Sequence, residues 1–158
     1  MSYEFLGKAI SGPFTIPSGI VTTAPSIMAR IMRDIPAVGV ITTKSIGLQP
    51  RAGNREPVYS QYAPGCFVNA VGLTNPGAHA SLAALQALEV PADKFLLVSI
   101  FGGSVEDFVE VAKLLAPVAD GIELNLSCPH AQGYGMAMGQ DPEMVAAIVR
   151  AVKAAVDI

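Results

Sequence analysis

Short apolar segments of strand length alternate along the chain with longer segments in which apolar residues recur at helical spacing. Residues 39–44, 95–100 and 121–125 are rich in apolar and β-branched side chains and become polar at their carboxyl ends. This pattern is typical of buried strands in a parallel sheet. A helical pattern follows each of these segments, so the sequence predicts a parallel α/β architecture.

The first residues predict a β-hairpin. Residues 5–10 and 12–16 have the length and composition of two short strands around a turn at Ser11 and Gly12. Residues 45–75 form a long polar stretch rich in glycine, proline and asparagine. Such a stretch is too long for a plain connection, so we interpret it as functional.

Capping signals mark where the helices begin. The predicted helix starts are Pro25 after a cap at Thr23 or Ala24, Pro76 after a cap at Asn75, Val105 after Ser104 with Asp107 as a near capping box, and Pro142 after Asp141. The helices are expected to run over about 25–33, 76–88, 105–116 and 142–156.

Composition excludes several classes of protein. Hydrophobic residues make up 51% of the 158 residues and charged residues 15%, the opposite of a disordered chain. The net charge of −3 argues against a nucleic-acid partner. No apolar run approaches the ~18 residues of a membrane span, and the first residues do not form a signal peptide. We therefore expect a cytoplasmic protein that is not bound to membranes.

Polar side chains collect where the predicted strands end. These residues are Ser18 and Gly19, Lys44 and Ser45, Ser99, and Asn125. In parallel α/β folds, ligands bind at the carboxyl ends of the strands. The sequence therefore predicts one site to which four separate strands contribute.

Three segments carry candidate chemistry. Lys44 at a strand end could hold an anion or an electron-rich ring, although a surface lysine is the ordinary alternative. The loop 69–77 offers backbone N–H groups that could bind a carboxylate, and a tight turn is its alternative. Cys128 could serve as a base or nucleophile, whereas most lone cysteines are small buried hydrophobes. His130 could act as an acid or base, or cap a turn. The other cysteine, Cys66, has no strand end beneath it, and no metal site is expected.

Four motifs together resemble the dihydroorotate dehydrogenase family. They are Thr42-Thr43-Lys44-Ser45, Pro50-Arg51-x-Gly53-Asn54, Asn69-Ala70-x-Gly72-Leu73-x-Asn75-Pro76-Gly77 and Glu123-Leu124-Asn125-x-Ser127-Cys128-Pro129. The resemblance implies a (β/α)8 TIM barrel, here the first four βα units preceded by an N-terminal β-hairpin. Residues 1–158 would form the N-terminal half of a flavin-dependent barrel domain.

The resemblance also implies FMN-dependent oxidation of dihydroorotate to orotate in pyrimidine biosynthesis. Cys128 would remove the proton from C5 as hydride leaves C6 for the flavin, and Lys44 would stabilise negative charge on the reduced flavin. The residues expected to bind FMN are Ser18, Gly19, Lys44, Ser45 and Asn125, to which the strand-end position adds Ser99. The residues expected to bind substrate are Lys44, Asn69, Val71, Gly72, Leu73, Asn125 and His130.

A cysteine base resembles the soluble branch of the family, and the loop at Asn69 resembles the NAD-linked branch. That branch pairs with a separate electron-transfer subunit that carries FAD and an iron–sulfur cluster. A homo-oligomer is also expected.

Two departures from the family pattern keep alternatives open. His130 stands where many members have asparagine, and the segment from Cys128 to Pro142 also resembles dihydropyrimidine dehydrogenase, which reduces uracil and thymine. The chain stops at Ile158, where the family would enter a fifth strand. A non-catalytic half barrel that needs a partner chain is therefore a third interpretation.

Overall fold

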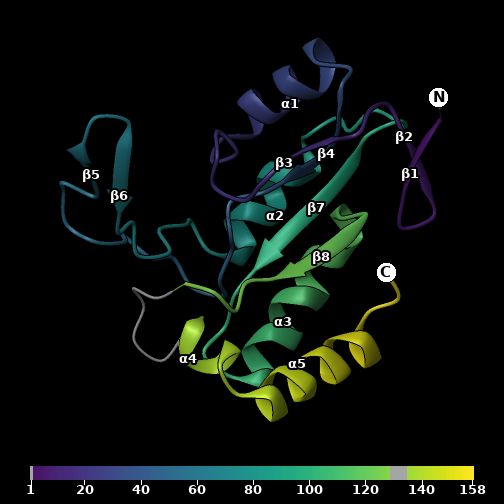
Figure 1. The fold of residues 1–158 in the computed structure, drawn as a ribbon. Coiled ribbons are helices and arrows are strands. Elements are labelled where there is room, and N and C mark those ends of the chain that lie inside the picture. The colour runs from purple at the N-terminus through teal and green to yellow at the C-terminus, as the bar shows by residue number, and fades with distance from the viewer. Residues whose placement is uncertain (1, 129–134) are drawn as a thin grey trace.

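A four-stranded parallel sheet forms the centre of the computed structural model, which describes residues 2–128 and 135–158 (Figure 1). The strands lie in the order β3 (Phe14–Ile16), β4 (Val38–Thr42), β7 (Phe95–Ile100) and β8 (Gly121–Leu124). Neighbours in the sheet are thus consecutive in the chain apart from a hairpin inserted after β4. This confirms the predicted βα alternation.

The helices pack against one face of this sheet. They are α1 (Pro25–Asp34), α2 (Ala78–Gln86), α3 (Val105–Leu115), the short α4 (Met136–Gly139) and α5 (Pro142–Ala155), with a 3₁₀ turn η1 (Ala116–Val118) after α3. Leu96, Val98 and Ile100 of β7 share one hydrophobic core with Phe108 of α3 and Ile148 of α5. Because strand side chains alternate, the other face of the sheet is left for Leu97 and Ser99. Among the described residues, no helix is long and apolar enough to cross a bilayer.

The N-terminal hairpin forms, but not where the sequence predicted it. Strands β1 (Tyr3–Phe5) and β2 (Lys8–Ile10) pair around a turn at Leu6 and Gly7, whose φ values are 48° and 81°. Two positive φ values match the right-handed twist of a two-residue hairpin. The predicted turn at Ser11 and Gly12 is wrong. The turn instead contains Leu6, an exposed apolar residue of a kind that turn rules do not favour. The segment predicted as the second strand of the hairpin becomes β3 and joins the parallel sheet.

Contacts with the amino ends of β7 and β8 hold this hairpin at the end of the sheet opposite the polar strand ends. The Phe5 and Phe95 rings meet edge to face, with centroids 4.9 Å apart. Lys8 Nζ lies 2.7 Å from Asp120 Oδ1, and Asp120 Oδ2 accepts a hydrogen bond from the Leu96 amide.

The long polar stretch contains a second hairpin that the sequence did not predict. Strands β5 (Tyr59–Ala63) and β6 (Cys66–Asn69) are antiparallel and project from the main body (Figure 1). Their residues are exposed almost throughout. Since neither face is buried, the sequence carries no apolar alternation to mark these strands.

Most predicted helix starts are confirmed. Asp107 N donates to Ser104 Oγ at the start of α3, and Asp141 Oδ1 accepts from the Glu143 and Met144 amides at the start of α5. Pro25 occupies the first turn of α1 after Ala24.

The predicted cap at Asn75 is wrong. Helix α2 begins at Ala78, after Gly77. Asn75 Oδ1 instead accepts from the amides of Gly47 (3.2 Å) and Gly77 (2.9 Å). The distant Gly47 therefore fixes this asparagine before the helix begins.

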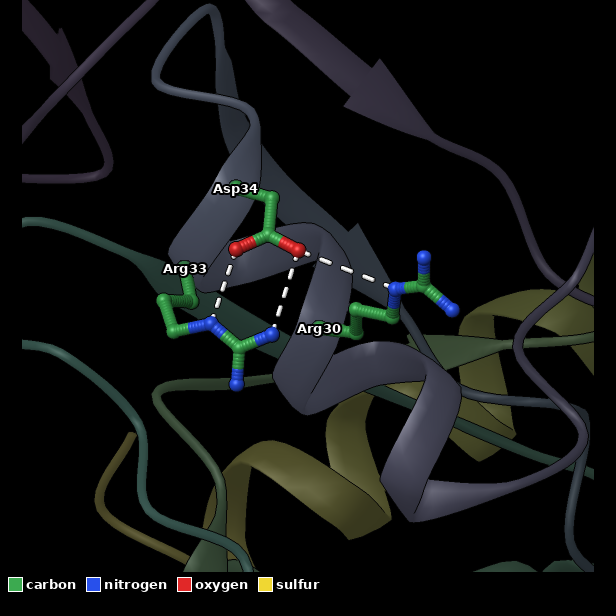
Figure 2. Close-up of polar contacts among 3 residues, drawn as sticks. All are labelled: Arg30, Arg33 and Asp34. Carbon is green, nitrogen blue, oxygen red and sulfur yellow. Dashed lines mark hydrogen bonds and ion pairs between the residues drawn. The ribbon is translucent and has the colours of Figure 1, made fainter.

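The carboxyl end of α1 carries a group of exposed charges, drawn in Figure 2. Arg33 Nε lies 2.8 Å from Asp34 Oδ1, and Arg30 Nε lies 3.7 Å from Asp34 Oδ2. The hydrogen bond from Arg33 holds the pKa of the Asp34 carboxyl below its usual value. Pairs this exposed contribute little to stability, so we assign them no role in holding the sheet.

A buried lysine joins three segments at the amino end of the sheet. Lys94 is 3% exposed, and its Nζ donates to Ser11 Oγ (2.7 Å), Ile35 O (3.2 Å) and Val38 O (2.7 Å). These acceptors belong to the linker after β2, the end of α1 and the start of β4. Lys94 therefore connects the hairpin linker to the first βα unit.

We expect Lys94→Met to lower the free energy of unfolding by about 2–3 kcal/mol, because it leaves buried acceptors without a donor. Urea denaturation followed by circular dichroism measures this loss. The exposed Lys113→Met is the matched control and should change stability little. Equal midpoints for the two variants would contradict the role given to Lys94.

Candidate active site

A cavity of about 1180 Å³ lies at the carboxyl ends of the parallel strands. Ten of the residues predicted for the site line it: Ser18, Gly19, Lys44, Ser45, Asn69, Val71, Gly72, Leu73, Asn125 and Cys128. The structure therefore brings together residues that are more than one hundred positions apart in the chain. His130 lies outside the described residues.

A hydrogen-bonded group of polar side chains forms under this cavity, with one member from each strand of the sheet. Ser45 Oγ lies 3.1 Å from Ser18 Oγ and 2.9 Å from Ser99 Oγ, and it accepts from Asn125 Nδ2 at 2.8 Å. We call Ser18, Ser45, Ser99 and Asn125 the strand-end network. Ser45 is its centre, because its hydroxyl contacts the other three.

Ser99 differs from its prediction. It is fully buried, its amide donates to Thr43 Oγ1, and it does not line the cavity. Strand alternation correctly predicts the face of the sheet on which Ser99 lies. The residue nevertheless lies one layer below the surface of the cavity. We therefore assign Ser99 to the support of Ser45 and not to contact with a ligand.

Asn125 is fixed at both ends of its amide. Its Nδ2 donates to Ser45, and its Oδ1 accepts from Ser127 N and Ser127 Oγ, both at 3.2 Å. An amide nitrogen carries two hydrogens, and among the described contacts only one is used. The other remains for a hydrogen-bond acceptor in the cavity.

Lys44 enters the cavity beside Gly19. A Cβ atom at Gly19 would lie 3.5 Å from Lys44 Cδ and 3.7 Å from Lys44 Nζ, and Gly19 has φ of 81°. Within the described part of the chain, the Lys44 ammonium forms no hydrogen bond or ion pair. Burial lowers the pKa of Lys44 from its ordinary 10.5, while negative charge on Cys128 acts in the opposite direction. The ammonium is thus available to an anionic or electron-rich ligand and is coupled electrostatically to Cys128.

The loop that follows β6 is held open toward the cavity by the motif at 50–54. Asn54 Nδ2 donates to Ala70 O (2.7 Å), and Asn54 N donates to Val71 O (2.9 Å). Gly72 and Leu73 have φ of 80° and 57°. A buried leucine in the left-handed region is strained, and such strain is concentrated at functional sites. The sequence showed this motif but not that it clamps the loop.

Cys128 is half-buried at the edge of the cavity. It packs against a small core cluster formed by Leu73 and Phe101. Its carbonyl accepts a hydrogen bond from Met136 N at 3.1 Å, so helix α4 begins against it. The sequence predicted a cysteine in a polar loop, and the structure adds this apolar backing.

Three polar residues that line the cavity were not among the residues predicted for the site: Tyr59, Glu123 and Ser127. Tyr59 reaches the cavity from the β5–β6 hairpin, which carried no sequence signal. Glu123 stands two residues before Asn125 and also lines the cavity. Strand alternation places side chains two positions apart on the same face, and this was the signal that could have predicted Glu123. Among residues 2–128 and 135–158, no cluster of three potential metal ligands occurs.

The chain is similar to known proteins over its whole length. A family model described as dihydroorotate dehydrogenase matches residues 1–158. The chain is 42% identical over 160 residues to the "Dihydroorotate dehydrogenase B (NAD(+)), catalytic subunit" of Pyrococcus abyssi, covering 99% of this chain and 51% of that protein. The subunit of the same name from Thermococcus kodakarensis is 43% identical, with 99% and 50% covered. The chain therefore spans about half the length of the curated relatives it matches.

Solved structures show the same fold. The crystal structure of Eimeria tenella DHODH in complex with ferulenol superposes with a TM-score of 0.80 over 97% of this chain and 43% of that one, at 20% identity. The ligand-free form gives 0.73. The predicted fold, the first four βα units of a barrel, is confirmed.

Proposed function

This chain belongs to the dihydroorotate dehydrogenase family, and from that premise we propose that residues 1–158 form the amino-terminal half of a flavin-binding barrel domain that oxidises dihydroorotate to orotate. The observation that carries the proposal is that Lys44, which follows β4, and Asn125 and Cys128, which both follow β8, line one cavity. A thiol that can act as a base, an ammonium beside developing negative charge and an oriented amide donor are groups that can serve such an oxidation.

The residues present fit FMN. The cavity volume of about 1180 Å³ exceeds the roughly 300–1,000 Å³ of ordinary small-molecule sites. Gly19 leaves room beside Lys44, and Asn125 keeps one amide hydrogen for an acceptor. Ser18, Gly19, Lys44, Ser45 and Asn125 would hold the flavin ring, which when bound accepts the hydride from C6 of the substrate.

The chain's own groups would act around that transfer. Cys128, as a thiolate, takes the proton from C5, because a base must lie within hydrogen-bond reach of the proton that it removes. Lys44 supplies positive charge where negative charge develops. Asn69 and the backbone of Val71, Gly72 and Leu73 bind the substrate carboxylate and ring. The apolar backing of Cys128 keeps water from one side of the thiol.

The names of the relatives support a proposal about the electron acceptor. Their names contain NAD(+) and "catalytic subunit", so we propose that this chain works with a partner subunit that passes electrons to NAD. The FAD and iron–sulfur cluster proposed for that subunit rest on the resemblance to the NAD-linked branch of the family. None of the relatives cited is named as a dihydropyrimidine dehydrogenase. His130, one of the residues on which that alternative rested, lies outside the described residues.

Flavin titration tests the proposal. Adding the purified protein to FMN should quench flavin fluorescence with a defined stoichiometry, and riboflavin, which lacks the phosphate, separates ring binding from phosphate binding. Under anaerobic conditions dihydroorotate should then bleach the flavin absorbance, whereas dihydrouracil, which lacks the carboxylate, should not. Bleaching by dihydrouracil alone would favour the dihydropyrimidine alternative. Absence of flavin binding would favour a non-catalytic half barrel.

A further inference from the structure

Helix α4 lies directly behind the backbone that carries Cys128. A Cβ atom placed at Gly139 would lie 2.2 Å from Leu126 O, and one placed at Gly135 would lie 2.5 Å from Cys128 O and 2.7 Å from Cys128 N. Real Cβ atoms do not approach backbone atoms this closely. Both positions therefore require glycine for α4 to keep its place.

The helix itself is anchored both in the hydrophobic core and on the backbone of Cys128. Met138 is 8% exposed and belongs to the main hydrophobic core. Met136 N donates to Cys128 O at 3.1 Å. Because Met138 packs in the main core, α4 is anchored by this side chain as well as by its contacts with residues 126–128.

The cysteine side chain is supported from the opposite direction. It packs on Phe101 and Leu73, which are 2% and 3% exposed. Phe101 is held in turn by Gly47, where a Cβ atom would lie 2.5 Å from the ring. Cys128 is thus confined between a backbone contact behind it and an aromatic ring beside it.

We propose that Gly135 and Gly139 are positioning residues for Cys128. Their missing side chains let α4 seat against residues 126–128, and this contact fixes where the thiol stands relative to Lys44. The effect on turnover rests on the proposed function, whereas the effect on the thiol does not. No role is assigned to the intervening residues 129–134.

Alkylation of the thiol provides the test. In a Cys66→Ser background, Cys128 is the only thiol, so its reaction with iodoacetamide can be followed by intact mass across the neutral pH range. Gly139→Ala is the main variant, because alanine otherwise favours a helix and the contact with Leu126 O is the added cost. Ala137→Gly is the matched control: it weakens the same helix but places no atom against Leu126.

We expect Gly139→Ala to change both the alkylation rate and its pH dependence, and to lower kcat about 100-fold, the effect of misplacing a catalytic group by roughly 1 Å. Ala137→Gly should react like the parent and bind FMN as the parent does. Alkylation of Gly139→Ala at the parent rate and with the parent pH dependence would overturn the proposal.

A second variant covers the case in which Gly139→Ala fails to fold. Phe101→Leu removes the support from the other side and should likewise change the alkylation profile; an unchanged profile counts against positioning. If Gly139→Ala alters alkylation while Cys128→Ser retains full turnover, positioning of the thiol stands and the proposed base role fails.

Discussion

Replacing Cys128 with serine is expected to lower dihydroorotate oxidation by about 100- to 10,000-fold near neutral pH, the usual contribution of a positioned general base. A serine hydroxyl occupies nearly the same space, but it is a far weaker acid than a thiol, so little of it is ionised at this pH. Flavin reduction by dihydroorotate, followed anaerobically by stopped flow, measures the loss directly.

The chain contains its own control for this experiment. Cys66→Ser makes the same chemical change at an exposed position in the β5–β6 hairpin and should leave turnover unaltered. Both variants should bind FMN as the parent does, since the flavin residues proposed above do not include either cysteine. Normal flavin reduction by Cys128→Ser would remove this residue from the base role.

Replacing Lys44 with methionine should lower flavin reduction by about 100- to 1,000-fold, as expected when a charge-stabilising donor is removed from an active site. Methionine preserves most of the apolar stem beside Gly19, so the loss would reflect the ammonium and not the packing. Stopped-flow reduction and orotate binding should both weaken. Unaltered values for both would exclude Lys44 from the site.

The same substitution has a consequence for stability. Burial lowers the pKa of Lys44 in the folded protein below its ordinary 10.5. Between the lowered and the ordinary pKa the unfolded chain binds more protons, so stability rises with pH across that window. At neutral pH the charged, partly buried lysine opposes folding. Lys44→Met should therefore raise the urea midpoint at neutral pH and flatten its rise at alkaline pH.

Lys113→Met is the comparison for this stability measurement, because Lys113 is an exposed lysine on α3 and its ammonium stays in water. A Lys44→Met variant that retains the alkaline rise in midpoint would show that another group causes it.

The strand ends of the site were accessible from sequence because a buried apolar run that turns abruptly polar is typical of the carboxyl end of a parallel strand. Lys44 and Asn125 both follow such runs and both line the cavity. How deeply each side chain is buried could not be predicted from the sequence in the same way. The period of two that marks strands gives the face of Ser99, but its complete burial depends on Ser45, which comes from another strand.

The errors have a common physical origin in contacts between distant segments. A cap rule is local, but Asn75 is held by Gly47. A turn rule favours polar residues, yet Leu6 occupies the first hairpin turn. The β5–β6 hairpin is exposed on both faces, so no burial pattern in the sequence predicts it. Tyr59 lies in this hairpin and was therefore not predicted as a residue of the site.

The strand-end network can form only when the four strands are in their native register. Ser45 Oγ contacts groups from the other three strands, and a slip of one residue turns every side chain of a strand to the opposite face. A slipped β4 would therefore abolish the network even if the helices still packed. Near the amino end of β4, a Cβ at Gly39 would lie 2.2 Å from Gly12 O. A substitution at Gly39, at the opposite end of the sheet, would therefore disturb the ligand site by changing the register of β4.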